Sequence, residues 1–405
     1  MISKNDLFEQ IAEQLDIPPY LHARAVDRYE AVGKYLDTKS INAHIYPQGS
    51  FRLGTVVRPI KNGADADYDV DLVCKFNINK SQTIPKIVKN TIGNALKENG
   101  NYSKLLEEEG RRCWTLVYSD SNAPGFHLDI LPSVQESSEQ IGNIVRNGVD
   151  LKFAINSIAI TNRIDLNNYE WGSSNPFGYA DWFDEINMPF YRMIEFDKKR
   201  GKLYESNKTL YASVDAVPTN LIKTPLQRVI QILKRHRDMR FSGTSFEDCK
   251  PISMIITTLV AQIVKNQQYL TPSVEILLQF VLDRIDEYAG LIQNEKNKMG
   301  GDIITRDFQT GKWYFPNPAN PYDNFAERWH EDNQKCARAF FEWVKWAKVD
   351  LSVDTLNKKS LEISFGKNLV EKAYANLESS STPNIIIQKP APIPIVNPGR
   401  AWSTK

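Results

Sequence analysis

The sequence has few cysteines, and they do not form the patterns that build a disulfide framework or a structural zinc site. Its four cysteines, Cys74, Cys113, Cys249 and Cys336, are scattered over 405 residues. No two of them form a Cys-x-x-Cys pair, and none combines with a histidine at zinc-finger spacing. We therefore predict four reduced cysteines that serve as packing residues, because free cysteine is among the most buried residue types.

The sequence also lacks an apolar run long enough to cross a membrane. Its longest apolar stretch, 252–264, is interrupted by serine, threonine and glutamine and falls short of the roughly 20 residues that a membrane helix needs. The first residues, MISKNDLFEQIAEQ, are acidic and amide-rich where a secretory signal requires an apolar core. We therefore expect a cytoplasmic protein without a membrane span.

An excess of one charge sign is missing as well. The chain carries 50 Lys and Arg residues against 49 Asp and Glu residues, which argues against a protein that coats nucleic acid through its phosphates. No stable nucleic-acid partner is expected. The length and the 41% hydrophobic content instead allow two or three domains, each with its own core.

The order of hydrophobic patterns predicts an α+β fold. Two amphipathic helices open the chain, and short apolar runs with strand character follow between residues 41 and 134, with a helical stripe over 84–96. Residues 168–189 have no clean period and are predicted to form an ordered loop region. After Pro225 the pattern is helical, including one long helix over 324–347.

These patterns divide the chain into three parts. We predict a mixed sheet with helices over 1–218, a helical domain over 219–378 and a flexible, proline-rich tail over 379–405. The tail ends in a Pro-Gly-Arg-Ala-Trp segment and Lys405. A segment of this composition is a candidate for recognition by, or attachment to, a partner protein.

Two aspartates on one predicted strand suggest a metal site. In the segment 68–72, alternation places Asp69 and Asp71 on one face and the apolar residues on the other. Neighbouring like charges need a compensating cation, and carboxylates suit Mg²⁺ or Mn²⁺. Asp129 stands in the same way among apolar residues of 126–131. If the two strands are neighbours, the three carboxylates form the ligand set for two metal ions.

A turn before these strands has the composition of a phosphate-binding loop. Gly49 and Ser50 follow a predicted strand and precede a predicted helix, where backbone N–H groups, assisted by the helix dipole, approach phosphate oxygens closely. Arg52 either reaches phosphate from the same turn or pairs with the acidic loop around Asp65.

These segments together resemble a known family. Pro47-Gln-Gly-Ser-Phe-Arg-Leu-Gly-Thr55, Tyr68-Asp-Val-Asp-Leu-Val73 and His127-Leu-Asp-Ile130 are similar to the motifs of the DNA polymerase β-like nucleotidyltransferases, and within them of the bacterial cGAS/DncV-like enzymes, the CD-NTases. The resemblance implies a bilobed protein with a central cleft. It implies Asp69, Asp71 and Asp129 as the catalytic metal ligands and, in the helical half, Lys234 and Ser253 as residues that approach the nucleotide.

The resemblance also implies a function. CD-NTases condense nucleoside triphosphates such as ATP and GTP into cyclic di- or trinucleotides, without a template, and the product activates an effector in antiphage defence. The zinc-binding insertion of the animal DNA sensor is missing, so activation by DNA through that module is not expected. Two alternatives keep the same site: transfer to an RNA end, a tRNA or a protein, and a nonenzymatic nucleotide-binding scaffold.

Several of these residues also have a purely structural interpretation. Asp69 and Asp71 on an exposed edge strand, Asp129 paired with an arginine or capping a helix, and His127 as a structural histidine are such alternatives. The basic run over 234–240 is alternatively a solvated helix face. Trp171 and Trp182 are expected to pack in the core rather than to stack on a base.

Overall fold

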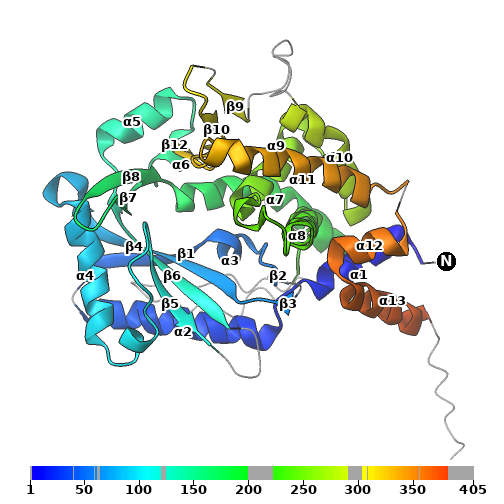
Figure 1. Ribbon diagram of the computed structural model, residues 1–405, viewed down its shortest axis with the longest axis horizontal. Helices are drawn as coiled ribbons and strands as arrows, with labels where there is room; N and C mark the ends of the chain where they lie inside the picture. Colours follow the sequence, from blue (N-terminus) through cyan, green and yellow to red (C-terminus); the bar gives the residue numbers. More distant parts are fainter. Residues whose placement is uncertain are drawn as a thin grey trace, which may run out of the picture.

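The structure is a computed structural model that describes residues 2–39, 41–58, 60–61, 64–119, 125–198, 222–290, 303–307, 309–354 and 356–381. In this part of the chain a mixed β-sheet and a large group of helices lie side by side (Figure 1). The predicted α+β fold is thereby confirmed. None of the helices within these ranges combines the length and the hydropathy needed to cross a membrane. Most of the predicted tail, 382–405, lies outside the described residues.

The main sheet is built around two parallel strands. β4 (Tyr68–Asn79) pairs in parallel with β6 (Phe126–Gln135) and antiparallel with β1 (Ala43–Gln48). β5 (Trp114–Tyr118) and β7 (Ile158–Arg163) pair antiparallel with β6, and β8 (Tyr169–Ser174) continues the sheet beyond β7. The strands predicted from the sequence between residues 41 and 134 are therefore β1, β4, β5 and β6.

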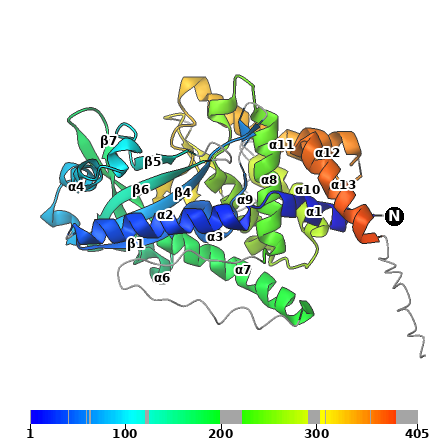
Figure 2. The same cartoon turned by 90° about the horizontal axis from the view of Figure 1, so that it is seen from below.

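The alternation of β4 gives the sheet two different faces. Tyr68, Val70 and Leu72 are buried against α2 (Pro19–Thr38) and α4 (Pro85–Glu98), and Figure 2 shows α2 running along the sheet. Asp69 and Asp71 alternate with them and therefore point to the opposite face. That face carries only a small apolar cluster and is the one that a binding site can use.

The helical half is organised around α8 (Pro225–Phe241). Thr224 and Gln227 form a reciprocal capping box at its start, with Pro225 in the first turn. The helices around it are α7 (Pro176–Lys198), α9 (Ser253–Gln267), α10 (Val274–Gly290), α11 (Lys335–Leu351), α12 (Lys358–Phe365) and α13 (Lys367–Ser381). The opening helix α1 (Lys4–Gln14) buries Leu7, Phe8 and Ile11 in this core.

Short elements complete the described chain. They are α3 (Gly49–Leu53), α5 (Ser138–Arg146), α6 (Leu151–Ala154), and the strands β2 (Ile60–Lys61), β3 (Ala64–Asp65), β9 (Thr305–Arg306), β10 (Trp313–Tyr314), β11 (Pro316–Asn317) and β12 (Asn320–Asn324). All four cysteines are free, as predicted; Cys74 is buried and the other three are half-buried.

The prediction of a loop region over 168–189 was wrong. This segment forms the end strand β8 and the long helix α7. Asn175 joins them: its side-chain oxygen accepts from the Gly178 N–H at 2.8 Å, and its amide donates to the Phe153 carbonyl at 2.8 Å. Aromatic side chains of α7, including Trp182, are buried in the helical core, so tertiary packing overrides the weak local pattern.

The prediction of one helix over 324–347 was wrong in its first half. Residues 320–324 form β12, and α11 begins only at Lys335. Asn324 explains the difference, because its side-chain oxygen accepts from the N–H groups of Phe315 and Ala326 while its amide donates to the Trp313 carbonyl. Such side-chain bonds to the backbone compete with helix formation.

The basic run of α8 is not a solvated helix face. Lys234 is 2% exposed, and Arg235 and Arg237 are each 6% exposed. Arg237 donates to the Pro251 carbonyl at 2.8 Å and pairs with Asp238, also at 2.8 Å. Buried cations need partners of this kind, because desolvation without them is costly.

Candidate active site

The site is centred on two aspartates that lie side by side on β4 and β6. In the parallel register Asp71 is the direct partner of Asp129, and Asp69 is the partner of His127. Residues paired in register project their side chains to the same face of a sheet. The expected adjacency of the two strands is therefore confirmed, and the carboxylates of Asp71 and Asp129 are brought together without any loop in between.

Asp71 is held in an environment that disfavours its charge. Burial raises the pKa of its carboxyl group to about 8, and the nearby charges of Asp129 and Asp69 add to the rise. Lys234 is the opposing influence, and it only partly offsets the effect. An ionised Asp71 thus lacks sufficient positive charge from the protein, which is the state expected of a carboxylate whose natural partner is a cation.

Asp129 is oriented by the neighbouring strand β5. The hydroxyl of Thr115, its register partner, donates to Asp129 Oδ1 at 2.5 Å. Burial raises the pKa of Asp129, and this hydrogen bond acts in the opposite direction. Asp129 therefore neither caps a helix nor pairs with an arginine among the described residues, because its hydrogen-bond partner is Thr115.

Asp69 is placed differently from the other two. Its side chain is exposed, and Oδ1 lies 3.3 Å from His127 Nδ1. This contact raises the pKa of His127. No group of three His, Cys, Asp or Glu side chains among the described residues is arranged to hold a metal ion as it stands. Asp71 and Asp129 are therefore the two neighbouring carboxylates of this face, whereas the side chain of Asp69 contacts His127.

The donor set nevertheless fits the expected divalent ions. Asp71 and Asp129 offer hard oxygen ligands on adjacent strands, and Asp69 lies on the same face. Mg²⁺ and Mn²⁺ prefer such oxygens and keep several water ligands, so they need only one or two carboxylates from the protein. Burial, and after it the repulsion from Asp129 and Asp69, raises the pKa of Asp71, and a bound cation opposes both effects by stabilising the ionised carboxylate.

We expect Mg²⁺ or Mn²⁺ to raise the melting temperature of the protein. At a metal concentration ten times the dissociation constant, the free energy of unfolding rises by roughly 1.4 kcal/mol. At a fixed metal concentration this increase should become larger from pH 6 towards pH 9, because the ion displaces the proton that Asp71 holds up to its pKa of about 8. Differential scanning fluorimetry with a metal titration measures it. An equal metal effect in Asp71→Asn would contradict this assignment.

The turn after β1 packs directly against Asp71. Gly49 begins α3 with a φ of 63°, and a Cβ atom built there would lie 2.3 Å from Asp71 Oδ2. Gly54 ends the turn at φ 66°, where a Cβ would lie 2.5 Å from Gln227 Nε2. Both positions therefore require glycine, and the backbone of the turn is held close to the carboxylate.

The other residues of the turn are positioned as follows. α3 has only five residues, so its dipole adds little and the predicted phosphate contacts depend on backbone N–H groups near Ser50. Ser50 is half-buried. Arg52 pairs with Asp184 of α7 at 2.7 Å, whereas the side chain of Asp65 lies outside the described residues. Phosphate binding by Arg52 stays a prediction.

Lys234 is hydrogen-bonded to the residue that follows the turn. Its ammonium group donates to the Thr55 carbonyl at 3.0 Å and to the Thr55 hydroxyl at 3.2 Å. Burial lowers its pKa to about 7, with the charge of Arg237 acting in the same direction. The hydroxyl of Ser253 accepts a hydrogen bond from Arg237 at 3.3 Å. Neither Lys234 nor Ser253 lines the pocket described next.

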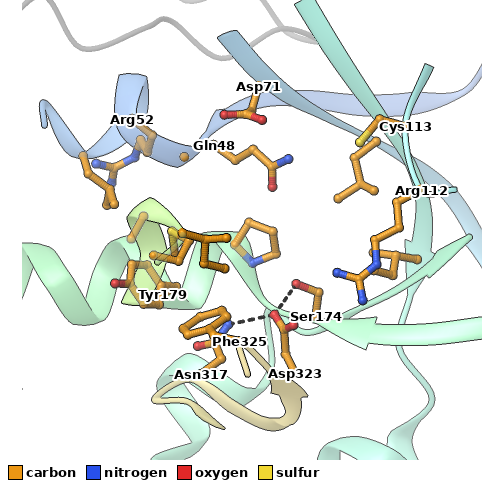
Figure 3. A pocket seen from close by; sticks show the side chains of 18 residues that line it. Gln48, Arg52, Asp71, Arg112, Cys113, Ser174, Tyr179, Asn317, Asp323 and Phe325 are labelled. Carbon is orange, nitrogen blue, oxygen red and sulfur yellow. Dashed lines mark hydrogen bonds between the residues drawn. The ribbon is translucent and has the colours of Figure 1, made fainter. Parts of the chain in front are cut away.

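A pocket of about 260 Å³ opens beside Asp71. Its walls come from the sheet, α3, α7, the start of α9 and the β11–β12 hairpin (Figure 3). Gln48, Arg52 and Asp71 form one side, whereas Ser174, Asn317 and Asp323 lie on the opposite side. Gly49 also lines the pocket. Trp171 and Trp182 are not among the lining residues and pack in the cores, as predicted.

The polar residues on that opposite side are not predictable from the sequence. Arg112, Ser174, Asn317 and Asp323 come from separate segments of the chain and belong to no recognisable motif. Ser174 stood in a segment predicted as a loop, and Asp323 directly precedes one predicted as a helix. Only the fold brings them to one pocket.

Comparisons with known proteins agree with the resemblance. Residues 43–132 match the family model described as "Cyclic GMP-AMP synthase DncV-like, nucleotidyltransferase domain". The chain is 27% identical over 329 residues to a c-di-GMP synthase of Roseivirga ehrenbergii, an alignment that covers 80% of this chain and 72% of the relative. It is 26% identical over 335 residues to the cyclic dinucleotide synthase CdnG of Bradyrhizobium diazoefficiens, covering 80% and 69%.

Solved structures show the same fold. The structure of Bradyrhizobium diazoefficiens CdnG in complex with GTP matches with a TM-score of 0.63 and 18% identity over 92% of this chain and 99% of that one. The CdnC of an E. coli CdnC:HORMA complex matches with a TM-score of 0.52 and 12% identity, covering 89% and 96%. Residues 43–132 thus match a DncV-like nucleotidyltransferase domain, and the chain is similar in sequence to two cyclic dinucleotide synthases and shares the fold of solved CD-NTases.

Proposed function

We propose that the protein condenses nucleoside triphosphates into a cyclic di- or trinucleotide and releases pyrophosphate. The observation that carries this proposal is the register pair Asp71 and Asp129, placed on the wall of a pocket and next to the Gly49 turn. The relatives support it, because both are named as synthases of cyclic dinucleotides.

The residues of the pocket divide the work of binding and orientation. The backbone of the Gly49 turn approaches the triphosphate, and Arg52 at the pocket wall binds it by exchanging its ion pair with Asp184 for a phosphate oxygen. Asp71 and Asp129, with Asp69, would hold two Mg²⁺ or Mn²⁺ ions, which neutralise the triphosphate and lower the pKa of an attacking ribose hydroxyl. Thr115 keeps Asp129 in position through its hydrogen bond.

Positioning supplies much of the catalysis in such a site. Phosphoryl transfer requires the attacking hydroxyl, the α-phosphate and the leaving pyrophosphate to lie in line. The carboxylates are on β-strands of a sheet rather than on loops, and residues on strands are positioned more precisely than residues on loops. Closure of a ring follows when the linear intermediate turns in the pocket and the transfer is repeated.

The substrates and partners follow from this chemistry. ATP and GTP are the expected triphosphates, and the product is expected to act on an effector protein in antiphage defence. The CdnC relative was solved in a complex with a HORMA protein, which makes a protein partner a reasonable expectation for this chain. The tail over 379–405 remains a candidate contact, although most of it lies outside the described residues.

Incubation with the four labelled triphosphates and Mg²⁺ or Mn²⁺ tests the proposal. We expect phosphatase-resistant products that mass spectrometry identifies as cyclic di- or trinucleotides, together with released pyrophosphate. Products that are extended RNA ends or labelled protein would instead indicate a different acceptor. The absence of any metal-dependent product from folded protein, in the presence of its partner proteins as well, would contradict the proposal.

A further inference from the structure

A small polar network lies on the wall of the pocket opposite Asp71. Asp323 of β12 accepts two hydrogen bonds, from the Ser174 hydroxyl at 2.7 Å and from the Asn317 amide at 3.1 Å. Figure 3 shows this network facing Gln48 and Asp71 across the pocket. The phosphate-binding and metal-binding residues are thus on one side, and a carboxylate is on the other.

Both of these hydrogen bonds are made to the same oxygen of Asp323. They end at Oδ2, and no described residue donates a hydrogen bond to Oδ1. Burial raises the pKa of this carboxyl group, and the two bonds offset only part of that effect. A carboxylate that lines a pocket with one oxygen unsatisfied is suited to a ligand that brings N–H donors.

The position of the carboxylate is fixed before any ligand binds. Asn317 is 3% exposed, and its side-chain oxygen accepts from the Ala319 N–H at 2.9 Å, so its amide nitrogen is the atom that faces Asp323. Asn320 donates to the Ser173 hydroxyl at 2.8 Å and ties β12 to β8. Specific recognition depends on this kind of rigid support.

The rest of the wall is suited to the flat body of a nucleobase. Pro176, Tyr179 and Phe325 present apolar and aromatic surface to the pocket. The volume of about 260 Å³ is close to the lower end of small-molecule sites, roughly 300 Å³. An apolar wall with a small number of placed polar groups is the common design of a small-molecule site.

Among the four bases, guanine matches a carboxylate best. Its N1–H and its 2-amino group are adjacent donors that point the same way, so both can be directed at the two free lone pairs of a single carboxylate oxygen such as Oδ1 of Asp323. Adenine, cytosine and uracil each place an acceptor nitrogen or carbonyl beside their donor, so one contact with the carboxylate becomes repulsive. A buried acceptor that is left unpaired is a strong basis for rejecting a wrong ligand.

We infer that Asp323 is a specificity-determining residue that reads the Watson–Crick edge of a guanine base bound in this pocket, supported by Ser174 and Asn317. This inference rests on the proposed function, because it assigns a base to the nucleotide whose phosphates approach Gly49. It makes a guanine nucleotide a required substrate and names the side chain that selects it.

Binding measurements test the inference without any need for turnover. Isothermal titration calorimetry with nonhydrolysable analogues of GTP, ITP and ATP is done first on the unaltered protein. We expect GTP to bind roughly 10- to 100-fold more tightly than ATP, since a hydrogen bond to a charged group is worth about 1.5–3 kcal/mol. ITP, which lacks the 2-amino group, should fall between the two.

The variant Asp323→Asn is then compared with a matched control. Asp323→Asn should lose most of the GTP preference and should no longer distinguish GTP from ITP. Asp307→Asn is the control, because Asp307 belongs to the neighbouring β9–β10 turn and bonds Gln309 and Thr310 rather than lining the pocket. It should bind all three analogues as the parent does. Thermal unfolding shows whether each variant is folded.

The outcomes separate this inference from the proposed function. Equal binding of GTP and ATP by the unaltered protein, or an undiminished GTP preference in folded Asp323→Asn, overturns the role of Asp323. If the unaltered protein nevertheless forms a cyclic product, the proposed function stands and only the role of Asp323 is wrong. Guanine-selective binding through Asp323 in a protein that makes no product supports the inference and contradicts the proposed function.

Discussion

Replacing Asp71 by asparagine is expected to reduce nucleotide condensation by roughly 10³-fold or more, because a metal-bound transition state gains several kcal/mol from its ions. The same change should leave the metal-free protein at least as stable as the parent at pH 8. Loss of activity together with retained stability is the pattern of a functional carboxylate. A structural carboxylate would lose both.

The stability argument follows from the direction of the pKa shift. Asp71 has a pKa of about 8 in the folded protein against an ordinary value of 3.8 for an exposed aspartate. The folded state therefore holds a proton that the unfolded state releases between these values, so the free energy of unfolding falls as the pH rises from about 4 to 8. Asparagine has no charge to bury, and the variant should lack this part of the decline.

Paired activity and unfolding measurements decide the matter. Pyrophosphate release gives the activity, and thermal unfolding in EDTA at pH 6 and pH 8 gives the stability. Asp27→Asn, on the exposed side of α2, is the control and should change neither quantity. A large loss of stability in Asp71→Asn at pH 8 would show that its carboxylate serves the fold instead.

Gly49→Ala is expected to disrupt the site through its backbone. The added Cβ would lie 2.3 Å from Asp71 Oδ2 at a residue whose φ is 63°, so either the turn or the carboxylate must move. A left-handed conformation alone costs an alanine about 1–2 kcal/mol. The displacement of Asp71 adds a loss of activity, which we expect to be at least 100-fold, because misplacement by about 1 Å has effects of that order.

Gly243→Ala separates the two causes. Gly243 has a φ of 73°, and nothing lies within 4 Å of the Cβ built there, so this variant carries the conformational cost without the clash. It should lose about 1–2 kcal/mol in denaturant unfolding and keep its activity. If Gly49→Ala matched Gly243→Ala in both measurements, the turn would not position Asp71.

The residues that the sequence could identify are those in local motifs on regular strands. Asp71 and Asp129 were predictable because strand alternation fixes the face on which a side chain lies, and the parallel pairing of β4 with β6 then makes them register partners. Gly49 was predictable from a different local signal, a Gly-Ser pair between a strand and a helix, and it lies where β1 ends and α3 begins. Periodicity of two is a strong local signal.

The rest of the pocket depends on contacts between distant segments. Ser174, Asn317 and Asp323 meet only because β8 and the β11–β12 hairpin pack together, and no local period reports that packing. Lys234 was singled out only by the family resemblance, as a nucleotide-binding residue, and its contact with Thr55 depends on how α8 packs against the turn. Sequence patterns predict secondary-structure elements better than they predict the tertiary packing between those elements.

The most direct test of the metal-site assignment is anomalous diffraction from crystals grown with Mn²⁺ and a nonhydrolysable GTP analogue. We expect manganese peaks in contact with the carboxylates of Asp71 and Asp129, with Asp69 turned away from His127 to join them. The triphosphate should lie along the Gly49 turn. Manganese peaks that touch neither Asp71 nor Asp129, beside a bound nucleotide, would contradict the assignment.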